Sequence, residues 1–302
     1  MLISEAVDAF QLYLLTERRV AHNTVSSYLS DLNQLENYLL RKHVTKLDQV
    51  DPEYLKAFLK NLRASRQIGA HSLARKISAL KVFFKFLEQR YSLTNLAINL
   101  IFPKLPHKLP HFLSEDEVEH LLEVAAQDTS DLGVRNRTML LLLYITGMRI
   151  TELTDLRIQS IQFDEGLISV YGKGDKQRLV PASPEVLQIV RNDYLAEVHA
   201  RLIAGRSTDY LFPTLHAGKL QNISRQSFWL ILKSLAQRAG IERPLSPHQL
   251  RHSLATHLLH KGANLRLLQK MLGHERLATV QIYTHVDLAY LREIYDKYHP
   301  RS

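Results

Sequence analysis

A proline-rich segment divides the 302-residue chain into two parts that cannot share one continuous helix. Residues 102–110 contain three prolines and two lysines. Because proline lacks a backbone N–H donor and clashes with the preceding helical turn, this segment favours an extended, basic connector. Each flanking part is long enough to bury a core of its own. We therefore predict a first domain at residues 1–102, a linker at 103–111, and a second domain at 112–302 that ends in a C-terminal tail.

The first part carries the apolar spacing of helices. Between residues 23 and 40, apolar side chains recur every three or four positions, and a stretch at 72–89 repeats this spacing. Asp51 followed by Pro52 has the form of an N-cap and a first helical residue. The outer face of the 72–89 helix is expected to carry four cations, Arg75, Lys76, Lys81 and Lys85, of which the first three are candidate DNA contacts. These cations are either contacts for a polyanion or an ordinary solvated face.

The second part mixes helices with a β-hairpin. Ser114 and Glu117 are spaced as in a capping box, and residues 135–144 form an apolar helix. Between 161 and 181 the apolar period changes to two on either side of a glycine-containing turn, which predicts a hairpin. From Pro184 onward the pattern is helical nearly to the end. The expected fold class is mainly α with a small β-sheet or hairpin.

Composition limits the chemistry and the compartment. The chain contains no cysteine, which excludes disulfides and cysteine metal sites. Glu5 and Asp8 interrupt the first apolar stretch, unlike a signal peptide, and the longest apolar run, 139–145, is too short to span a membrane. We expect a soluble, cytoplasmic protein without a membrane partner. The formal net charge of +9 favours a polyanion, because basic side chains that neutralise phosphates release counterions.

Four segments of the second part concentrate polar residues that a globular core does not need. They lie at 146–153, 172–178 and 246–252, and at 272–274 together with 282–285. In the third segment, Ser246 has the form of an N-cap, so His248 and Arg251 lie near each other at the start of a helix. A cation, an imidazole and free backbone N–H groups there form an anion site. A capped surface helix with incidental charges would show the same pattern.

Two cations and a tyrosine stand out in the other segments. Arg149 follows Gly147 at the end of the apolar helix, and Glu152, three residues on, is placed to hold its guanidinium. Lys173 lies in a glycine-bounded turn, from which its ammonium can reach a ligand. Taken singly, the arginine closes a helix, the lysine is a solvated turn residue, and Tyr283 is one tyrosine among thirteen. Only their combination indicates a function.

Together, the segments resemble the tyrosine recombinase family. The motifs T-G-x-R-x-x-E-L, G-K-G-x-K-x-R, H-x-L-R-H, L-G-H and I-Y-T-H occur in the family's order. The resemblance spans nearly the whole chain, and the region of Phe228 and Trp229 and the C-terminal tail are most similar to the XerD branch of the Xer recombinases. It implies a two-domain architecture, with a helical SAM-like N-terminal domain that clamps DNA and an α-rich catalytic domain.

The resemblance implies six catalytic residues, Arg149, Lys173, His248, Arg251, His274 and Tyr283. Tyr283 is expected to attack a DNA phosphorus and become joined to the 3′ phosphate, while guanidiniums bind the non-bridging oxygens. Ionising a phenol at pH 7 costs about 4 kcal/mol, so either proton transfer to His248 or strong local positive charge is expected to lower this cost. Lys173 is expected to protonate the departing 5′ oxygen. The two guanidiniums and His274 can replace the metal ions that many nucleases use, so no metal is expected. Because the phosphotyrosine preserves the bond energy, no ATP or other cofactor is expected either. Lys176 and Arg178 are further candidate DNA contacts.

The resemblance also implies partners. Recombination joins two duplexes, so we expect a tetramer on double-stranded DNA, formed as a heterotetramer with a second related recombinase and activated by a septal DNA translocase. The expected role is the resolution of chromosome dimers at a dif-like site. Residues 288–298 are expected to pack either on a neighbouring protomer or on their own domain.

Three alternatives compete with this interpretation. The first alternative is another enzyme with the same chemistry, either an integrase of a phage or mobile element or a relaxing topoisomerase. A DNA-binding module without catalysis is a second alternative, although all six catalytic positions are filled. A metal hydrolase is the third, with four candidate ligands, His248, His252, His257 and His274.

Departures from the Xer pattern at Asn136, Arg137 and Thr151 are not expected to touch the site.

Overall fold

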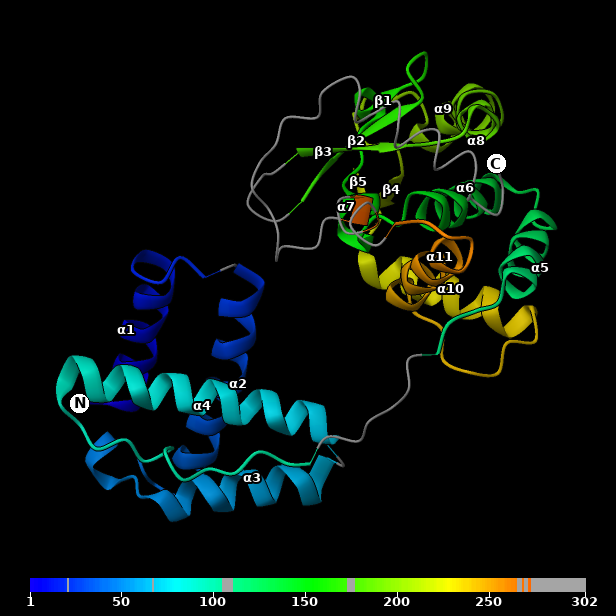
Figure 1. The fold of residues 1–302 in the computed structure, drawn as a ribbon. Coiled ribbons are helices and arrows are strands. Elements are labelled where there is room, and N and C mark those ends of the chain that lie inside the picture. Colours follow the sequence, from blue (N-terminus) through cyan, green and yellow to red (C-terminus); the bar gives the residue numbers. More distant parts are fainter. Residues whose placement is uncertain are drawn as a thin grey trace. The chain divides into compact units, whose positions relative to one another are not determined.

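The computed structural model describes residues 1–20, 22–66, 68–104, 111–172, 177–264, 268 and 271–272. The chain forms two compact units, Met1–Leu109 (unit 1) and Pro110–Ser302 (unit 2), each with its own hydrophobic core (Figure 1). Helices make up most of the described residues, and every strand among them belongs to unit 2. The predicted fold class, mainly α with small β-sheets, is confirmed.

Unit 1 is a helical bundle built on the apolar stripes of its sequence. Its helices are α1 (Ile3–Thr16), α2 (His22–Leu40), η1 (Leu47–Gln49), α3 (Pro52–Arg66) and α4 (Ala70–Tyr91). Helix α1 packs against α2, and α4 packs against both (Figure 1). The amide of Tyr54 donates to Asp51 Oδ1 at 2.9 Å, so Asp51 caps α3 as predicted.

One cation of α4 lies inside unit 1. Lys76 is only 3% exposed, and its Nζ donates to Oδ1 of buried Asp31 at 2.6 Å. The prediction that Lys76 lies on the outer face is therefore wrong. The reason is helical geometry, because Lys76 precedes Leu80 by four positions and Phe83 by seven and so shares their buried face.

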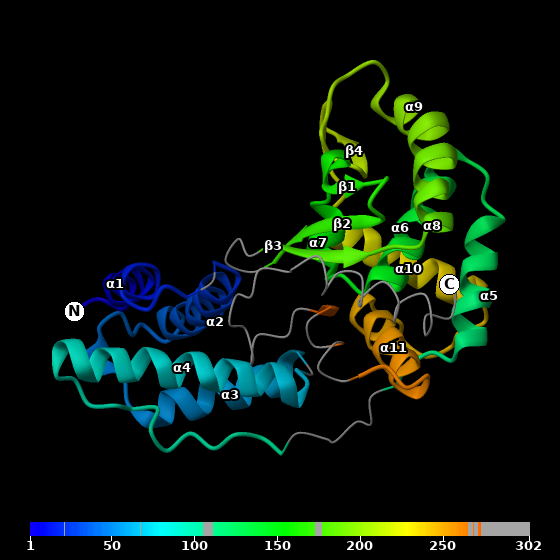
Figure 2. The same ribbon diagram turned by 45° about the horizontal axis from the view of Figure 1, so that its top comes forward.

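Unit 2 is organised around one helix whose C-terminal half is buried on all sides. Its helices are α5 (Glu115–Ala126), α6 (Asp131–Thr146), α7 (Ile150–Thr154), η2 (Ile158–Ser160), α8 (Pro184–Gln188), the π-helix η3 (Ile189–His199), α9 (Ala200–Ile203), α10 (Arg225–Arg238) and α11 (Pro247–His260). Every residue of α6 from Thr138 to Thr146 is buried, since α5, η3, α10 and α11 pack around it (Figure 2). The predicted capping box at Ser114 and Glu117 opens α5.

The predicted hairpin forms the main sheet. Strands β1 (Ile161–Gln162), β2 (Leu167–Tyr171) and β3 (Gln177–Pro181) are antiparallel in the order β1-β2-β3. Val170 pairs with Arg178, and Ile168 pairs with Val180. Because side chains alternate along a strand, Arg178 and Val180 point to the same face of the sheet. The turn at 173–176 lies outside the described residues.

A second hairpin was not predicted. Strands β4 (Pro213–His216) and β5 (Lys219–Asn222) form a two-stranded antiparallel sheet in the stretch where we expected only helix. The two turn residues, Ala217 and Gly218, have φ values of 47° and 78°. A two-residue hairpin loop needs positive φ at both positions, and glycine supplies one of them without strain. The prediction of a helical pattern after Pro184 is wrong at this point.

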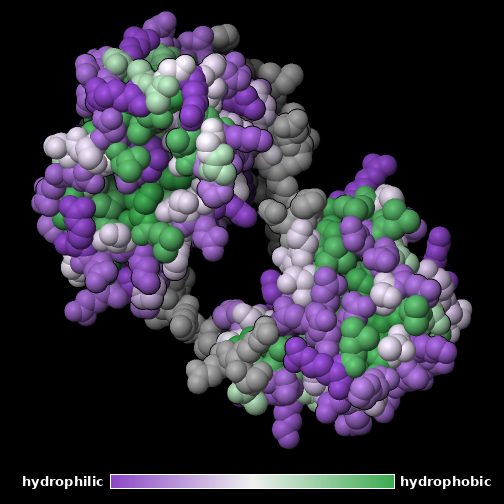
Figure 3. Space-filling view, turned by 180° about the vertical axis from the view of Figure 1, so that it is seen from behind, coloured by the Kyte–Doolittle hydropathy of each residue, from purple (hydrophilic) through white to green (hydrophobic). Residues whose placement is uncertain are grey.

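The surface of both units mixes hydrophilic and hydrophobic residues, as the rear face shows (Figure 3). Exposed large apolar side chains include Ile98 and Ile101 in unit 1 and Leu215 and Leu230 in unit 2. Within the described ranges, no helix combines the length and the hydropathy needed to cross a bilayer.

Candidate active site

Arg149 stands between two helices at a sharp change of direction. Helix α6 ends at Thr146, its C-cap Gly147 has a left-handed φ of 58°, and Arg149 is the N-cap of α7. A Cβ on Gly147 would lie 2.7 Å from Leu272 Cδ2 and 2.9 Å from Leu254 Cδ2. Glycine therefore satisfies both the backbone conformation and the close packing here. The turn places Arg149 at the end of the buried helix, with its side chain partly exposed.

Glu152 accepts hydrogen bonds from both the backbone amide and the guanidinium of Arg149. The amide of Arg149 donates to Glu152 Oε2 at 2.5 Å, and its Nη1 donates to Oε1 at 2.9 Å, which confirms the contact expected from their spacing. Burial would raise the pKa of Glu152, but hydrogen bonds and positive charge from Arg178 and hydrogen bonds from Arg149 outweigh it and keep that pKa below its ordinary value. The carboxylate is therefore ionised at neutral pH.

Arg178 approaches the same carboxylate from strand β3. Its Nη1 and Nη2 donate to Oε1 and Oε2 of Glu152, both at 2.7 Å, and its Nε donates to the carbonyl of Met271 at 3.2 Å. The residue is 8% exposed. This is the setting of a buried, fully engaged cation, whereas the sequence had suggested a surface contact with DNA. The alternation with buried Val180 was the signal that could have shown it.

Arg251 enters from the start of α11. The helix begins at Pro247 with Ser246 as N-cap, as predicted, and the Ser246 hydroxyl accepts from the amide of Gln249. Arg251 is buried, with Nη1 donating to the carbonyl of Gly147 at 2.5 Å and Nη2 donating to the carbonyl of Leu272. Burial, with the nearby positive charges of Arg149 and Arg178, lowers the pKa of Arg251 to about 10. It remains a cation at neutral pH.

His248 lies one turn before Arg251 and is exposed. Burial of part of its ring lowers the pKa of His248, and the neighbouring positive groups Arg251, His252 and Arg149 lower it further. The imidazole is therefore neutral at pH 7 and able to accept a proton.

The structure thus brings three of the six predicted catalytic residues together, Arg149, His248 and Arg251. The other three, Lys173, His274 and Tyr283, lie outside the described residues, as does Lys176. Among the candidate DNA contacts of unit 1, Arg75 is 48% exposed and bonds to Asp31 at 2.9 Å. Lys81 is half-buried, donates to the carbonyl of Ile98 at 3.1 Å, and lies 5.3 Å from the ring centroid of Phe102.

The histidines of α11 do not form a metal site. Both ring nitrogens of buried His257 are engaged, since Nε2 lies 2.7 Å from the carbonyl of Leu113 and Nδ1 lies 2.9 Å from the hydroxyl of Tyr144. A carbonyl only accepts, so Nε2 carries the proton and Tyr144 donates to Nδ1. In the described part of the chain, no three His, Asp or Glu side chains gather as metal ligands. His257 is a structural residue.

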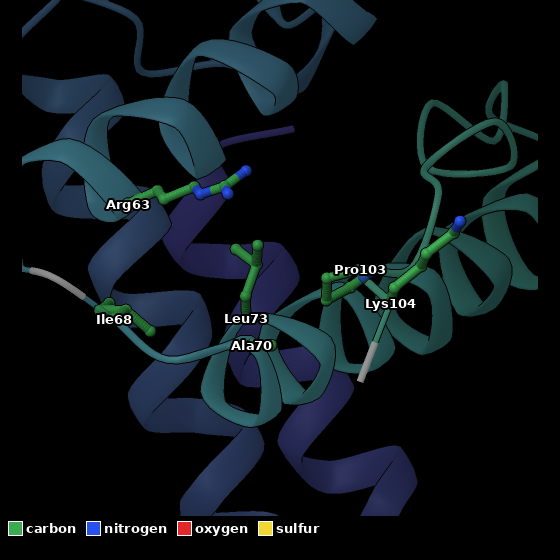
Figure 4. Close-up of a pocket in the computed structure, with 6 residues that line it drawn as sticks. All are labelled: Arg63, Ile68, Ala70, Leu73, Pro103 and Lys104. Carbon is green, nitrogen blue, oxygen red and sulfur yellow. The ribbon is translucent and has the colours of Figure 1, made fainter. Parts of the chain in front are cut away.

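A hollow of about 330 Å³ lies in unit 1, apart from these residues. It is lined by Arg63, Ile68, Ala70, Leu73, Pro103 and Lys104 (Figure 4). Four of its six lining residues are apolar and two are cations, and none is an acid or a nucleophile. The hollow is therefore not the place where the predicted chemistry is assembled.

Two family models match the chain. The phage integrase family matches residues 111–289, and the phage integrase N-terminal SAM-like domain matches residues 7–91. A tyrosine recombinase XerD from Staphylococcus aureus strain Mu50 is 37% identical over 301 residues, which cover 98% of this chain and 99% of the relative. The chain belongs to the phage integrase family of tyrosine recombinases. The predicted resemblance to the Xer recombinases is confirmed.

Solved structures of other tyrosine recombinases share this fold. The XerH recombinase, in a pre-cleavage complex with its difH substrate, is 26% identical with a TM-score of 0.66, over 89% of this chain and 78% of the XerH chain. A lambda integrase (75–356) dimer bound to a COC′ core site has a TM-score of 0.64 at 17% identity, over 94% of this chain and 100% of that chain, which shows the fold alone.

Membership in the family establishes the class of reaction. A tyrosine recombinase is an enzyme that cleaves and rejoins DNA strands, so this chain is a site-specific DNA recombinase. The alternatives of a DNA-binding module without catalysis and of a metal hydrolase are thereby set aside.

Proposed function

We propose that this tyrosine recombinase binds double-stranded DNA at a dif-like site in the cytoplasm and resolves chromosome dimers before cell division. The 37% identity to a XerD recombinase over nearly the full length of both chains supports this role. So does the likeness to XerH, which was solved with its difH substrate. A mobile-element integrase of the same chemistry is the alternative, but the lambda integrase shares only the fold with this chain.

The observation that carries the proposed chemistry is the convergence of Arg149 and Arg251 at the end of α6. Arg251 donates to the carbonyl of Gly147, two residues before Arg149, and the nearby charge of Arg149 contributes to the lowered pKa of Arg251. Such a pair of like charges is stabilised when an anion binds between them. A DNA phosphate, with two non-bridging oxygens, is suited to both guanidiniums, and the charge it gains in the transition state strengthens these contacts.

The remaining roles complete one reaction. Tyr283 attacks phosphorus and becomes joined to the 3′ phosphate, and neutral His248 takes the phenolic proton. Lys173 protonates the departing 5′ oxygen, and His274 donates a further hydrogen bond to the phosphate. The 5′ hydroxyl of a second strand then displaces Tyr283, which returns the phosphodiester without a cofactor.

The two domains on either side of the linker are proposed to have different roles. Residues 1–102 clamp the duplex, 103–111 form the linker, and 112–302 carry the chemistry and the C-terminal tail. Arg75, Lys81 and Lys176 are the proposed DNA contacts. Two duplexes require a tetramer, which we propose to be a heterotetramer with a second related recombinase, activated by a septal DNA translocase.

A nicked suicide duplex that carries the candidate chromosomal site tests the nucleophile. The wild-type chain is expected to form a protein–DNA adduct that survives denaturation, both with and without a chelator. Tyr283→Phe is expected to form none, while the matched control Tyr91→Phe, at an exposed tyrosine of unit 1, forms the adduct normally. An equal adduct in Tyr283→Phe would exclude the assigned nucleophile, and loss of the adduct with chelator would exclude the metal-independent chemistry.

A further inference from the structure

Arg178 fixes both oxygens of Glu152 with a two-pronged hydrogen bond. Its Nη1 and Nη2 each lie 2.7 Å from one carboxylate oxygen, so the carboxylate cannot rotate without breaking a bond. The same two oxygens accept from the Nη1 and the amide of Arg149. Arg178 and Arg149 are therefore linked through one shared carboxylate.

The other side of Arg178 holds backbone that belongs to a different motif. Its Nε donates to the carbonyl of Met271, while Arg251 donates to the carbonyl of Leu272, the next residue. In the sequence, Leu272 opens the L-G-H motif. The two guanidiniums of Arg178 and Arg251 thus bind consecutive carbonyls where this motif begins, and Arg251 also binds the carbonyl of Gly147, two residues before Arg149.

These contacts close a ring. It passes from Arg149 through Glu152 and Arg178 to the backbone at 271–272, and returns through Arg251 to Gly147. A buried ion pair adds little net stability compared with apolar residues of the same volume, because desolvation offsets its attraction. The ring of directed hydrogen bonds instead holds at a fixed separation the two guanidiniums, of Arg149 and Arg251, that are proposed to bind a phosphate.

We propose that Arg178 is a positioning residue for strand cleavage, which orients Arg149 through Glu152 and ties strand β3 to the backbone that leads into the L-G-H motif. The proposal rests on the proposed function, because it needs Arg149 to act on the phosphate. It replaces the surface DNA contact that the sequence suggested for Arg178.

The test separates positioning from a merely structural role. Four variants of the full chain are compared with wild type on the suicide duplex, Arg178→Met, Arg178→Lys, Arg149→Gln, and Arg178→Met combined with Arg149→Gln. Arg191→Met is the matched control, since Arg191 lies on η3 and makes an exposed ion pair with Asp164. The rate of adduct formation is measured with DNA saturating, beside the Kd for uncleaved duplex and the thermal unfolding midpoint.

Arg178→Met is expected to slow cleavage about 100-fold, because small misplacement of a reacting group is costly, while the Kd for DNA changes little. Arg178→Lys is expected to slow cleavage less, about 10-fold, because an ammonium cannot make the forked contact. If Arg178 acts through Arg149, adding Arg178→Met to Arg149→Gln lowers the rate by less than about threefold, since residues that act as one unit are not additive.

Two results would overturn the inference. Cleavage by Arg178→Met at the wild-type rate would do so, and so would fully additive losses in the double variant, which would mark a structural role. Should Arg178→Met not bind DNA or not fold, the same comparisons are made with Arg178→Lys, alone and combined with Arg149→Gln, and these decide the matter. Absence of an adduct in the wild-type chain would instead overturn the proposed function and the inference together, which keeps the two failures distinct.

Discussion

Each unit buries one carboxylate between two cations, but the two clusters are built differently. In unit 1, Oδ1 of Asp31 accepts from both Lys76 and Arg75, at 2.6 and 2.9 Å, and within the described residues Oδ2 has no hydrogen-bond partner. In unit 2, both oxygens of Glu152 are used, because Arg178 takes one with each prong of its guanidinium. The Glu152 cluster therefore fixes the orientation of its carboxylate more completely than the Asp31 cluster does.

The difference follows from the cations. A lysine ammonium is a compact point charge, whereas a guanidinium is a planar fork that determines the orientation of its partner. Lys76 joins α4 to α2 across a buried contact, and one oxygen is enough for that purpose. Arg178 sets the plane of Glu152 and hence the direction of Arg149. We infer that the first cluster serves stability and the second serves chemistry.

Removing the carboxylate of the second cluster has the largest expected effect. Glu152→Ala leaves buried Arg178 without its counter-charge, which is expected to cost about 3–5 kcal/mol of unfolding free energy. It also releases Arg149, so cleavage by DNA-saturated protein is expected to fall about 100- to 1000-fold. Denaturant unfolding and adduct formation measure the two effects, with exposed Glu123→Ala on α5 as the control. Normal cleavage by folded Glu152→Ala would contradict the comparison.

Removing the carboxylate of the first cluster is expected to affect stability alone. Asp31→Ala leaves Lys76 buried with only Gln34 as a bonded partner, which costs about 3 kcal/mol and lowers the melting transition of unit 1. Cleavage at saturating DNA, below that transition, is expected to stay at the wild-type rate. Combining Asp31→Ala with Lys76→Met is expected to restore most of the stability, because no buried charge is then left unpaired. A slow cleavage step in folded Asp31→Ala would show that both clusters serve chemistry.

The smallest effect is expected at the exposed arm of the first cluster. Arg75→Gln is expected to change the unfolding free energy by less than about 1 kcal/mol, because Arg75 is half exposed to solvent. If Arg75 contacts a phosphate, the slope of log Kd for DNA against log salt falls by about one unit. Arg90→Gln, at a more exposed arginine of α4, is the comparison. An unchanged slope in Arg75→Gln would remove Arg75 from the proposed DNA contacts.

The helices and the local half of the site could be predicted from sequence. Arg149 and Glu152 are three residues apart, so their contact follows from helical spacing. The cap at Ser246, which places His248 and Arg251, is equally local. The bond from Arg251 to Gly147 joins residues 104 positions apart, and no periodicity indicates such a pairing.

The errors arose where a charge is buried against a distant partner. Lys76 is 45 positions from Asp31, and Arg178 is 26 positions from Glu152. Charged side chains are placed on the surface by default, so each was assigned to solvent although its position matched a buried face. The β4–β5 hairpin was missed for another reason, since its strands are four residues long and half exposed and show little apolar alternation.

Gly147 is a position at which even a small substitution is expected to disturb the site. Arg251 donates hydrogen bonds to two carbonyls, those of Gly147 and Leu272. The space that a side chain at Gly147 would occupy is filled by the side-chain ends of two buried leucines, Leu254 and Leu272 itself. A single added methyl group is expected to clash with these two leucines and to strain the backbone whose carbonyl Arg251 binds, without altering any group that reacts. Genetic screens restricted to reacting side chains would overlook this position, because Gly147 contributes by having no side chain.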